Sequence, residues 1–366
     1  MDSKRITFCI PSLGSGGAER VVSVLANKLI ERGFDVSILM LSRLKCQYRL
    51  DDRVKIKCID CDADTALPIY RRLPLRLQKI RKEVRELQPD VVISFMAETN
   101  IDVCLALWTM KVPIIVSERN DPAMDPPGQV KKWLRCIAYR KPRGFVFQTP
   151  DAQAYFPQRI RAHSQIILNP LDEHLPMPCT QEEREKRIVA VGRLNQQKRF
   201  PLLIDAFSLF IKAYPEYILE IYGEGELEAE LHRLIETKGL QEKIQLKGFC
   251  RDVHQQIRTA AMFVMTSGYE GMPNALQEAM AIGVPSISTD CPCGGPRMLI
   301  RPGQNGILVP VGERDALVKA MSDMAQNPAK AQQMAQEASG IRELAAAQTI
   351  TDGWVEFIGA CLEGRQ

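Results

Sequence analysis

Short apolar runs alternate with longer amphipathic stretches along almost the whole chain, and this alternation most constrains the fold. In the first half of the 366-residue chain, strand-like runs occur at residues 5–10, 36–41, 54–58, 90–94, 114–117 and 145–147. Helix-like stretches lie between them, near residues 18–31, 74–88, 98–109, 129–140 and 149–156. Strands that alternate with helices form a parallel sheet covered by helices on both faces. The sequence therefore predicts an α/β protein.

The length of the chain and a second set of alternating segments predict two domains. A chain of 366 residues is long for a single hydrophobic core. The alternation stops near residue 171, passes through a stretch rich in proline and charge, and resumes at residue 187. We predict a first domain over residues 1–171, a linker over 172–186, a second domain over 187–344 and a final helix over 345–361.

The composition is that of a soluble globular protein, with 45% hydrophobic and 25% charged residues. No run of eighteen apolar residues occurs, and the N-terminus lacks the long apolar region of a signal peptide. We expect a cytoplasmic protein whose eleven cysteines are reduced. Cys58-x-x-Cys61 and Cys291-x-Cys293 lack a second paired motif at zinc spacing, and the four histidines are scattered, so no metal site is predicted.

The charge is divided unevenly between the two halves. Residues 1–171 hold 28 Lys and Arg against 18 Asp and Glu, a net +10, and the remainder holds 20 against 26, a net −6. Six cations and four leucine or isoleucine residues share residues 71–82. This segment is either an ordinary surface helix, a nucleic-acid contact, or a helix that lies on an anionic membrane with its apolar residues in the headgroup region. No aromatic residues are interleaved with the charges, so we favour the membrane over nucleic acid. A second basic group could extend this face: Lys131, Lys132, Arg135, Arg140, Lys141 and Arg143.

Two carboxylates flank the start of a helix in the second half. Glu270 lies in a predicted strand-to-helix loop, Pro273 suits the first helical turn, and Glu278 follows about two turns into the helix. Side chains lean towards a helix N-terminus, so both carboxylates can reach one crevice. An anion in that crevice would meet the positive end of the helix dipole and the amides of Gly271, Met272 and Asn274. This combination suits a phosphate beside sugar hydroxyl groups.

Other loops add groups that bind phosphate. Arg193 and Lys198 flank a strand-to-helix loop, so their charges can converge on a diphosphate. Gly16 and Gly17 belong to a glycine-rich loop that feeds a helix and can offer its amides to phosphate. The loop is not a dinucleotide fingerprint, because Glu19 takes the place of the third glycine. The acidic turn Asp60-Cys61-Asp62-Ala63-Asp64 is interpreted as an ordinary turn rather than a metal-diphosphate site.

The segment Glu270-Gly271-Met272-Pro273-Asn274, with Glu278 eight positions after Glu270, resembles the donor-site motif of the family-4 retaining glycosyltransferases of GT-B fold. The resemblance covers nearly the whole chain and implies two Rossmann-like domains that face one cleft. It implies that the first domain binds the acceptor, that the second binds the nucleotide sugar, and that the C-terminal helix packs back on the first. No cofactor or metal is expected.

The resemblance also implies roles for individual residues. Arg193, Lys198 and Glu270 would be catalytic, with the two cations stabilising the leaving diphosphate. Donor binding would involve Glu278, Gly271, Met272, Asn274, Gly223 and Gly225. Relatives often place a histidine in the loop after the strand at residues 114–117, where this chain has Glu118, Arg119 and Asn120. Glu118 and Arg119 either form an ordinary ion pair or belong, with Gly16 and Gly17, to an acceptor and phosphate site.

We expect transfer of a hexose or N-acetylhexosamine, with formation of an α-glycosidic bond, to a glycan carried on a polyprenyl diphosphate. The expected setting is assembly of O-antigen, capsule or exopolysaccharide at the inner face of the cytoplasmic membrane. Two alternatives stay open: another GT-B enzyme such as a sugar-nucleotide epimerase, and a non-catalytic subunit that binds a nucleotide sugar. The sequence does not distinguish UDP, GDP and ADP donors.

Overall fold

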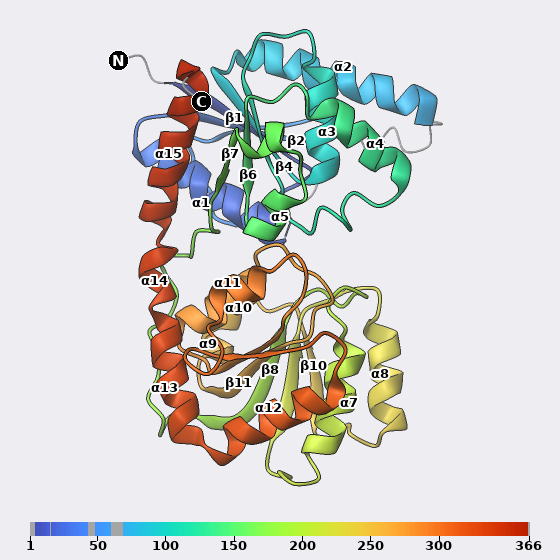
Figure 1. Ribbon diagram of the computed structural model, residues 1–366, viewed down its shortest axis with the longest axis vertical. Helices are drawn as coiled ribbons and strands as arrows, with labels where there is room; N and C mark the ends of the chain where they lie inside the picture. The colour runs from blue at the N-terminus through green and yellow to red at the C-terminus, as the bar shows by residue number, and fades with distance from the viewer. Residues whose placement is uncertain (1–3, 15, 43–47, 60–68, 365–366) are drawn as a thin grey trace. The chain divides into compact units, whose positions relative to one another are not determined.

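A computed structural model describes residues 4–14, 16–42, 48–59 and 69–364. The chain divides into two compact units: unit 1 comprises Met1–Asp172 and Ala345–Gln366, and unit 2 comprises Glu173–Leu344 (Figure 1). Each unit is built on one parallel sheet, which confirms the α/β class. The acidic turn at residues 60–64 and the Cys61 thiol lie outside the described residues.

Unit 1 contains a seven-stranded sheet in the order β3-β2-β1-β4-β5-β6-β7. Its strands are β1 (Arg5–Ile10), β2 (Asp35–Met40), β3 (Lys55–Cys58), β4 (Val91–Phe95), β5 (Ile114–Ser117), β6 (Gly144–Phe147) and β7 (Ser164–Ile166). Its helices are α1 (Gly17–Glu31), α2 (Ile69–Leu87), α3 (Ala97–Ala106), α4 (Gln129–Ala138), α5 (Pro150–Ala154), α6 (Gln158–Arg161) and α15 (Ala347–Glu363). Helices α1 and α15 pack together on one face, and α3 packs between α2 and α4 on the other (Figure 1).

The C-terminal helix α15 completes the core of unit 1. Trp354 is buried, and its ring stacks on Phe95 of β4 with 5.8 Å between centroids. Phe357 and Cys361 follow on the same helix and lie so close to Gly144 that a Cβ there would be 2.6 Å from the Cys361 sulfur. Arg32, just after α1, pairs with Asp352 of α15 at 2.6 Å. The last segment of the chain thus belongs to the same core as the first.

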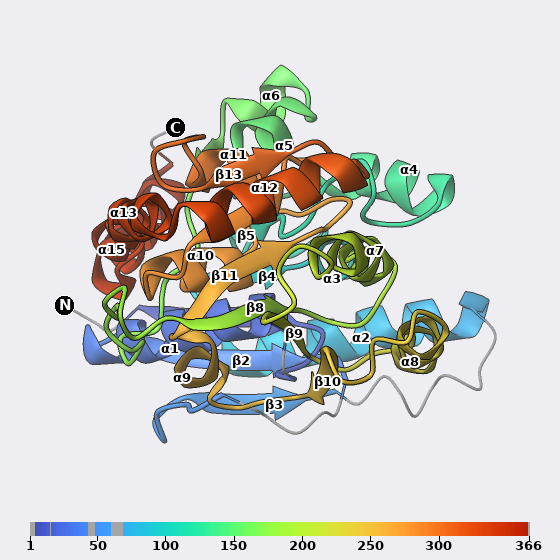
Figure 2. The ribbon, with the colours of Figure 1, turned by 90° about the horizontal axis from the view of Figure 1, so that it is seen from below.

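Unit 2 contains a six-stranded sheet in the order β10-β9-β8-β11-β12-β13 (Figure 2). Its strands are β8 (Glu185–Val191), β9 (Ile218–Tyr222), β10 (Ile244–Gly248), β11 (Ala260–Met265), β12 (Ser286–Thr289) and β13 (Ile307–Val309). Its helices are α7 (Phe200–Phe210), α8 (Glu228–Thr237), α9 (Val253–Ile257), α10 (Asn274–Ala281), α11 (Gly295–Leu299), α12 (Arg314–Gln326), α13 (Pro328–Ser339) and α14 (Ile341–Leu344). Helix α7 packs on α8 and α12, and α10 packs on α9, α13 and α14.

Two basic helices of unit 1 differ from the sequence predictions. Helix α2 begins at residue 69 rather than near 74, so Pro74 lies inside it. Ile80 is fully buried, so this side chain packs against the protein and cannot enter a membrane. In α4 the predicted basic residue Arg135 points inward, with a side chain that is 3% exposed. A buried guanidinium contributes nothing to a basic surface, so the second basic group is smaller than predicted.

Candidate functional site

Four loops meet at one edge of the sheet in unit 2. They follow the adjacent strands β9, β8, β11 and β12, whose carboxyl ends point the same way because all four strands are parallel. Ligands of open α/β sheets bind at this edge. The predicted donor-site residues lie on these loops and on α10, the helix that follows β11.

The centre of this edge is an ion pair between Lys198 and Glu270. The Lys198 ammonium lies 2.5 Å from Glu270 Oε1, and the two side chains are 17% and 9% exposed. The Thr266 hydroxyl donates to the carbonyl of Lys198 at 2.8 Å, which holds the loop after β8 against the loop after β11. The predicted convergence of these two residues, which are 72 positions apart in the chain, is therefore present.

The loop after β12 fixes the backbone on both sides of the Glu270 side chain. The amide of Glu270 donates to the carbonyl of Pro292 at 2.6 Å, and its carbonyl accepts from the amide of Cys293 at 2.9 Å. A Cβ on Gly295 would lie 1.8 Å from the carbonyl oxygen of Gly271, so only glycine permits this approach. The spacing of Cys291 and Cys293 suggested at most a metal clip, but the backbone of this segment positions Glu270 instead.

Helix α10 presents the second predicted carboxylate. It starts at Asn274 after Pro273 and ends in a Schellman motif, in which Gly283 has φ +68° and the amide of Val284 donates to Ala279 at 2.9 Å. Glu278 lies in the second turn and is buried. The predicted helix is present, with Pro273 at its N-cap rather than in its first turn.

Glu278 has a partner that sequence reasoning missed. His254 Nε2 lies 2.8 Å from Glu278 Oε2, and the side chains are 12% and 9% exposed. His254 belongs to α9, which packs on α10. No local motif marks this histidine, because the contact depends on the packing of two helices. The arrangement holds the carboxylate in one orientation.

We expect His254→Ala to weaken binding of the nucleotide part of a donor by about tenfold, because a nearly buried carboxylate loses a hydrogen-bond partner worth roughly 1–2 kcal/mol. Titration calorimetry with nucleoside diphosphates measures the change. His254→Gln keeps a donor group at this position and should bind nearly as wild type. Equal dissociation constants for wild type and His254→Ala would contradict a positioning role.

Arg193 lies in the loop after β8 that also carries Lys198, and the two predicted donor-site glycines lie in the neighbouring loop after β9. Arg193 is exposed, and its side chain has no hydrogen-bond or ion-pair partner among the described residues. Gly223 has φ +138°, and a Cβ there would lie 2.0 Å from the carbonyl oxygen of Gly192. A Cβ on Gly225 would lie 2.3 Å from the carbonyl oxygen of Leu194. These glycines let the loop after β9 support the loop that carries Arg193.

In unit 1 the glycine-rich loop leads directly into α1. Gly16 precedes the first residue of α1, and its carbonyl accepts from the Tyr48 hydroxyl at 3.1 Å. The carboxylate of Glu19 folds over Gly16, where a Cβ would lie 2.3 Å from Glu19 Oε2. Gly17 is the first helical residue. The space above Gly16 is thus occupied by an acidic side chain from the first turn of α1.

Glu118 and Arg119 do not form the ion pair that was one of the two expectations. The Glu118 carboxylate is buried, accepts from the Tyr139 hydroxyl and lies 3.9 Å from Arg135. The Arg119 guanidinium lies 4.3 Å from the centre of the Phe95 ring and donates to Asn169 at 2.7 Å. Burial lowers the pKa of Arg119 to about 9. The neighbouring residues point in different directions because they follow a strand.

We expect Glu118 to make the stability of unit 1 depend on pH. Burial raises the pKa of Glu118 from 4.5 to about 7. The native protein therefore keeps this proton when the unfolded chain loses it, so stability is complete below about pH 4.5 and falls as the pH rises through about 7. The loss reaches at most about 3 kcal/mol.

Denaturant unfolding of wild type and Glu118→Gln between pH 5 and pH 8 tests this expectation, with other titrating groups cancelling in the difference. The Gln variant keeps the contact to the Tyr139 hydroxyl and should gain stability relative to wild type as the pH rises. A difference that does not vary with pH would contradict the raised pKa.

Two negative observations apply to the described residues only. Residues 4–14, 16–42, 48–59 and 69–364 contain no group of three His, Cys, Asp or Glu side chains arranged to hold a metal. In the same ranges, none of the helices combines the length and the apolar character that a bilayer span requires.

Sequence models of known families match both units. The model described as Glycosyltransferase Family 4 matches residues 15–175, and the model described as Glycosyl transferases group 1 matches residues 178–340. The chain belongs to the family-4 glycosyltransferases. The Lys198–Glu270 pair and Glu278 all lie within the second matched segment of this glycosyltransferase.

Curated relatives and solved structures agree with this assignment. An uncharacterized glycosyltransferase of Haemophilus influenzae is 25% identical, covering 96% of this chain and 99% of that protein. The GalNAc-alpha-(1->4)-GalNAc-alpha-(1->3)-diNAcBac-PP-undecaprenol alpha-1,4-N-acetyl-D-galactosaminyltransferase of Campylobacter jejuni is 28% identical, covering 87% and 88%. The structure of Anabaena Alr3699/HepE with UDP and glucose superposes with a TM-score of 0.82 at 17% identity, covering 98% and 100%. This glycosyltransferase therefore has the GT-B fold of two Rossmann-like domains.

Proposed function

We propose that this glycosyltransferase moves a hexose or N-acetylhexosamine from a nucleotide sugar to a glycan carried on a polyprenyl diphosphate, with retention and formation of an α-glycosidic bond. The observation that carries the proposal is the Lys198–Glu270 pair, which places a cation and a sugar-binding carboxylate 2.5 Å apart at the ligand edge of unit 2. The Campylobacter jejuni relative, whose name specifies an undecaprenol-linked acceptor, supports the choice of acceptor.

The reaction breaks the bond between the anomeric carbon and the diphosphate through a state with oxocarbenium character. Negative charge develops on the departing diphosphate, and Lys198 and Arg193 neutralise it. The amides of Gly271 and Met272 and the positive end of the α10 dipole act on the same oxygens. These fixed charges stabilise the leaving group without a metal ion or a cofactor.

The two carboxylates orient the donor through its hydroxyl groups. Glu270 accepts from hydroxyl groups of the transferred sugar, and its contact with Lys198 keeps both groups aligned before the donor arrives. Glu278 accepts from the ribose hydroxyls while His254 fixes its orientation. Carboxylates are acceptors only, so they suit hydroxyl groups and repel the phosphates towards the cations.

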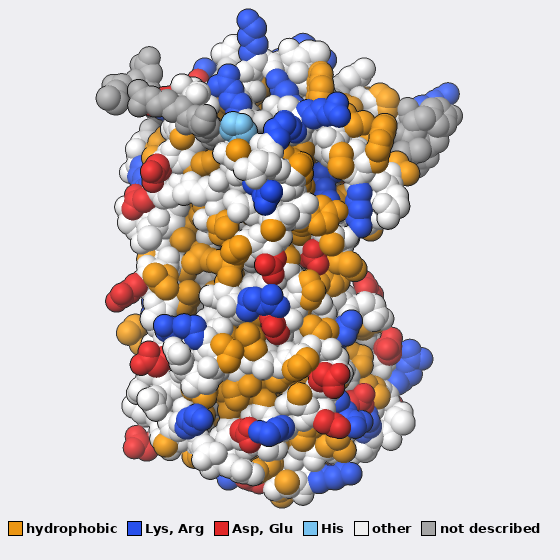
Figure 3. Space-filling view, viewed as in Figure 1, with side chains coloured by type: hydrophobic (Ala, Val, Ile, Leu, Met, Phe, Trp, Pro, Cys, Tyr) orange, Lys and Arg blue, Asp and Glu red, His pale blue; other side chains and the backbone are white. Residues whose placement is uncertain are grey.

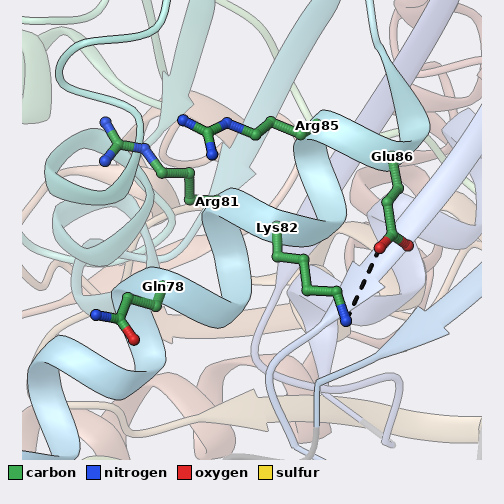
Figure 4. A pocket seen from close by; sticks show the side chains of 5 residues that line it. All are labelled: Gln78, Arg81, Lys82, Arg85 and Glu86. Atoms are coloured by element: carbon green, nitrogen blue, oxygen red, sulfur yellow. Dashed lines mark ion pairs between the residues drawn. The ribbon is translucent and has the colours of Figure 1, made fainter.

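An anionic membrane surface at the cytoplasmic face is the proposed location, and the basic helix α2 supports it. Arg71, Lys82 and Arg85 are exposed on α2. Figure 4 shows Arg81 and Arg85 one turn apart with side chains extending the same way, while Lys82 points to Glu86 at 3.9 Å. These side chains and Gln78 line an open groove of about 450 Å³. Such cations attract anionic headgroups.

The test is transfer of a radiolabelled sugar from a panel of UDP, GDP and ADP sugars to lipid-linked glycans in anionic vesicles. The proposal expects a labelled glycolipid with one donor, whose α-linkage is checked by specific glycosidases, and equal activity with and without a chelator. Turnover of the donor without any acceptor would favour an epimerase. Tight donor binding without transfer to any acceptor would favour a binding subunit.

A further inference from the structure

Helix α4 of unit 1 buries an arginine and exposes two apolar residues, both of which are unusual for an amphipathic surface helix. Its arginine, Arg135, points inward and is 3% exposed, donating to the carbonyls of Asp125 and Pro122 at 2.7 and 2.9 Å. Two of its apolar residues are exposed, Val130 at 72% and Trp133 at 63%, while Leu134 and Ile137 are half-buried. Surface helices normally bury such residues and expose the charge. The outward face therefore serves a purpose other than packing within the chain.

Three exposed apolar residues lie on α4 and in the segment just before it. Val130 and Trp133 are three positions apart and share one face of α4. Met124, which is 51% exposed, lies in the loop that leads into this helix. Isolated exposed hydrophobic residues are common on proteins, but three large ones within ten positions are not explained by chance exposure. We call Met124, Val130 and Trp133 the α4 patch.

The charges around the α4 patch identify its partner. Arg140 is exposed two residues beyond α4, and Lys131, on the helix itself, is 46% exposed and pairs with Glu98. Helix α2, with its exposed cations, lies on the other side of α3. Figure 3 shows hydrophobic side chains among Lys and Arg side chains where Figure 1 draws α3 and α4. Apolar residues with a tryptophan, set among cations, fit an anionic bilayer surface.

A second copy of the chain fits this surface less well. A two-fold symmetric dimer would place the same patch and the same cations against each other, so like charges would meet across the interface. Lipid phosphates carry the opposite charge and accept the cations. The bilayer also offers an apolar layer a few ångströms below the headgroups, into which the side chains of the patch reach.

We infer that the α4 patch inserts into the headgroup boundary of an anionic bilayer and anchors unit 1 there, while α2 contributes charge attraction. The inference rests on the membrane-bound acceptor of the proposed function. It adds that α4, and not the leucine-rich basic helix α2, provides the apolar anchor. On α2, Ile80 is fully buried and Leu73, Leu75 and Leu77 are half-buried, so α2 exposes less apolar surface than α4 and contributes mainly its charge.

Tryptophan fluorescence tests the insertion directly, because the chain has three tryptophans and Trp354 is buried. Full-length Trp108→Phe retains Trp133 as its exposed tryptophan, and Trp133→Phe retains Trp108, which is 43% exposed. With vesicles of phosphatidylcholine and phosphatidylglycerol, we expect a blue shift for Trp108→Phe and none for Trp133→Phe. Quenchers attached to lipids at the headgroup boundary should reduce the tryptophan fluorescence of the Trp108→Phe variant and leave that of the Trp133→Phe variant unchanged.

Vesicle sedimentation supplies the second measurement. Val130→Ser with Trp133→Ser should weaken vesicle binding by about tenfold or more and abolish the binding that wild type retains in high salt. Trp108→Ser is the matched control and should bind as wild type. Both changes affect exposed side chains, so circular dichroism should show all variants folded.

Three outcomes are informative. Vesicle binding that disappears entirely in high salt, without a shift of Trp133 fluorescence, would overturn the inference and leave the transfer reaction standing. A concentration-dependent dimer that Trp133→Ser dissociates, with no vesicle binding, would also overturn it. Insertion of Trp133 without transfer to any lipid-linked acceptor would support the anchor and reject the proposed function.

Discussion

Replacement of Lys198 by alanine is expected to lower kcat by about 10²- to 10³-fold, the range found when one donor to a developing negative charge is removed. Lys198 is held 2.5 Å from Glu270, at the edge where the diphosphate departs. Its charge matters most when the anomeric bond breaks, so the loss should appear in kcat more than in KM. The variant also leaves the nearly buried Glu270 carboxylate without its cation.

Steady-state transfer assays with the donor identified by the panel would measure this effect. Lys186→Ala is a matched control in the same unit, because Lys186 is 61% exposed and pairs with Glu216 away from the loops of the site. That variant should keep wild-type kcat and KM. A Lys198→Ala enzyme with kcat within about threefold of wild type would remove the leaving-group role, since this is less than 1 kcal/mol.

Trp354→Ala is expected to destabilise unit 1 by about 3–5 kcal/mol, the usual cost of truncating a large aromatic side chain in a core. Trp354 is 1% exposed and stacks on Phe95, and the Arg119 guanidinium lies 5.9 Å from its ring. Removing the indole leaves a cavity between α15 and β4. It also removes part of the support for Arg119, a predicted acceptor-site residue.

Denaturant unfolding followed by circular dichroism would measure this loss, with the transition of unit 1 resolved from that of unit 2. Trp108→Ala serves as the comparison, because Trp108 is 43% exposed and its loss should cost no more than about 0.5 kcal/mol. Trp354→Phe should cost less than the alanine change, since it keeps a ring against Phe95. Equal stability of the two alanine variants would mean that α15 is not part of the core of unit 1.

Most strands of unit 1 could be predicted from the sequence because each is a short apolar run between turns, and two of them, Arg5–Ile10 and Ile114–Ser117, were predicted at their observed bounds. The short strand Ser164–Ile166 was not predicted, because only one of its three residues is apolar. Helix ends were less predictable. The sequence predicted a helix near residues 74–88, but α2 begins five residues upstream, at Ile69, and contains Pro74. The burial of Arg135 on α4 could not be predicted, because it depends on two carbonyl groups, of Pro122 and Asp125, in the loop before the helix.

The candidate site was predictable where its residues lie on a local motif. Glu270 and Glu278 share one loop and helix, and Lys198 follows a neighbouring strand of the same sheet. His254 and Cys293 could not be found this way, since their contacts depend on how distant segments pack. The same limit explains the wrong ion pair: Glu118 and Arg119 are adjacent in sequence, but Tyr139 and Asn169 determine where they point.

The discontinuity of unit 1 sets the order in which the chain can fold during translation. Residues 173–344 form a contiguous unit, so they can fold once they leave the ribosome. Unit 1 is made first but lacks α15 until unit 2 has been synthesised, so the site on the sheet for Trp354 stays open until then. The half of the protein that is translated earliest is therefore the last to be finished.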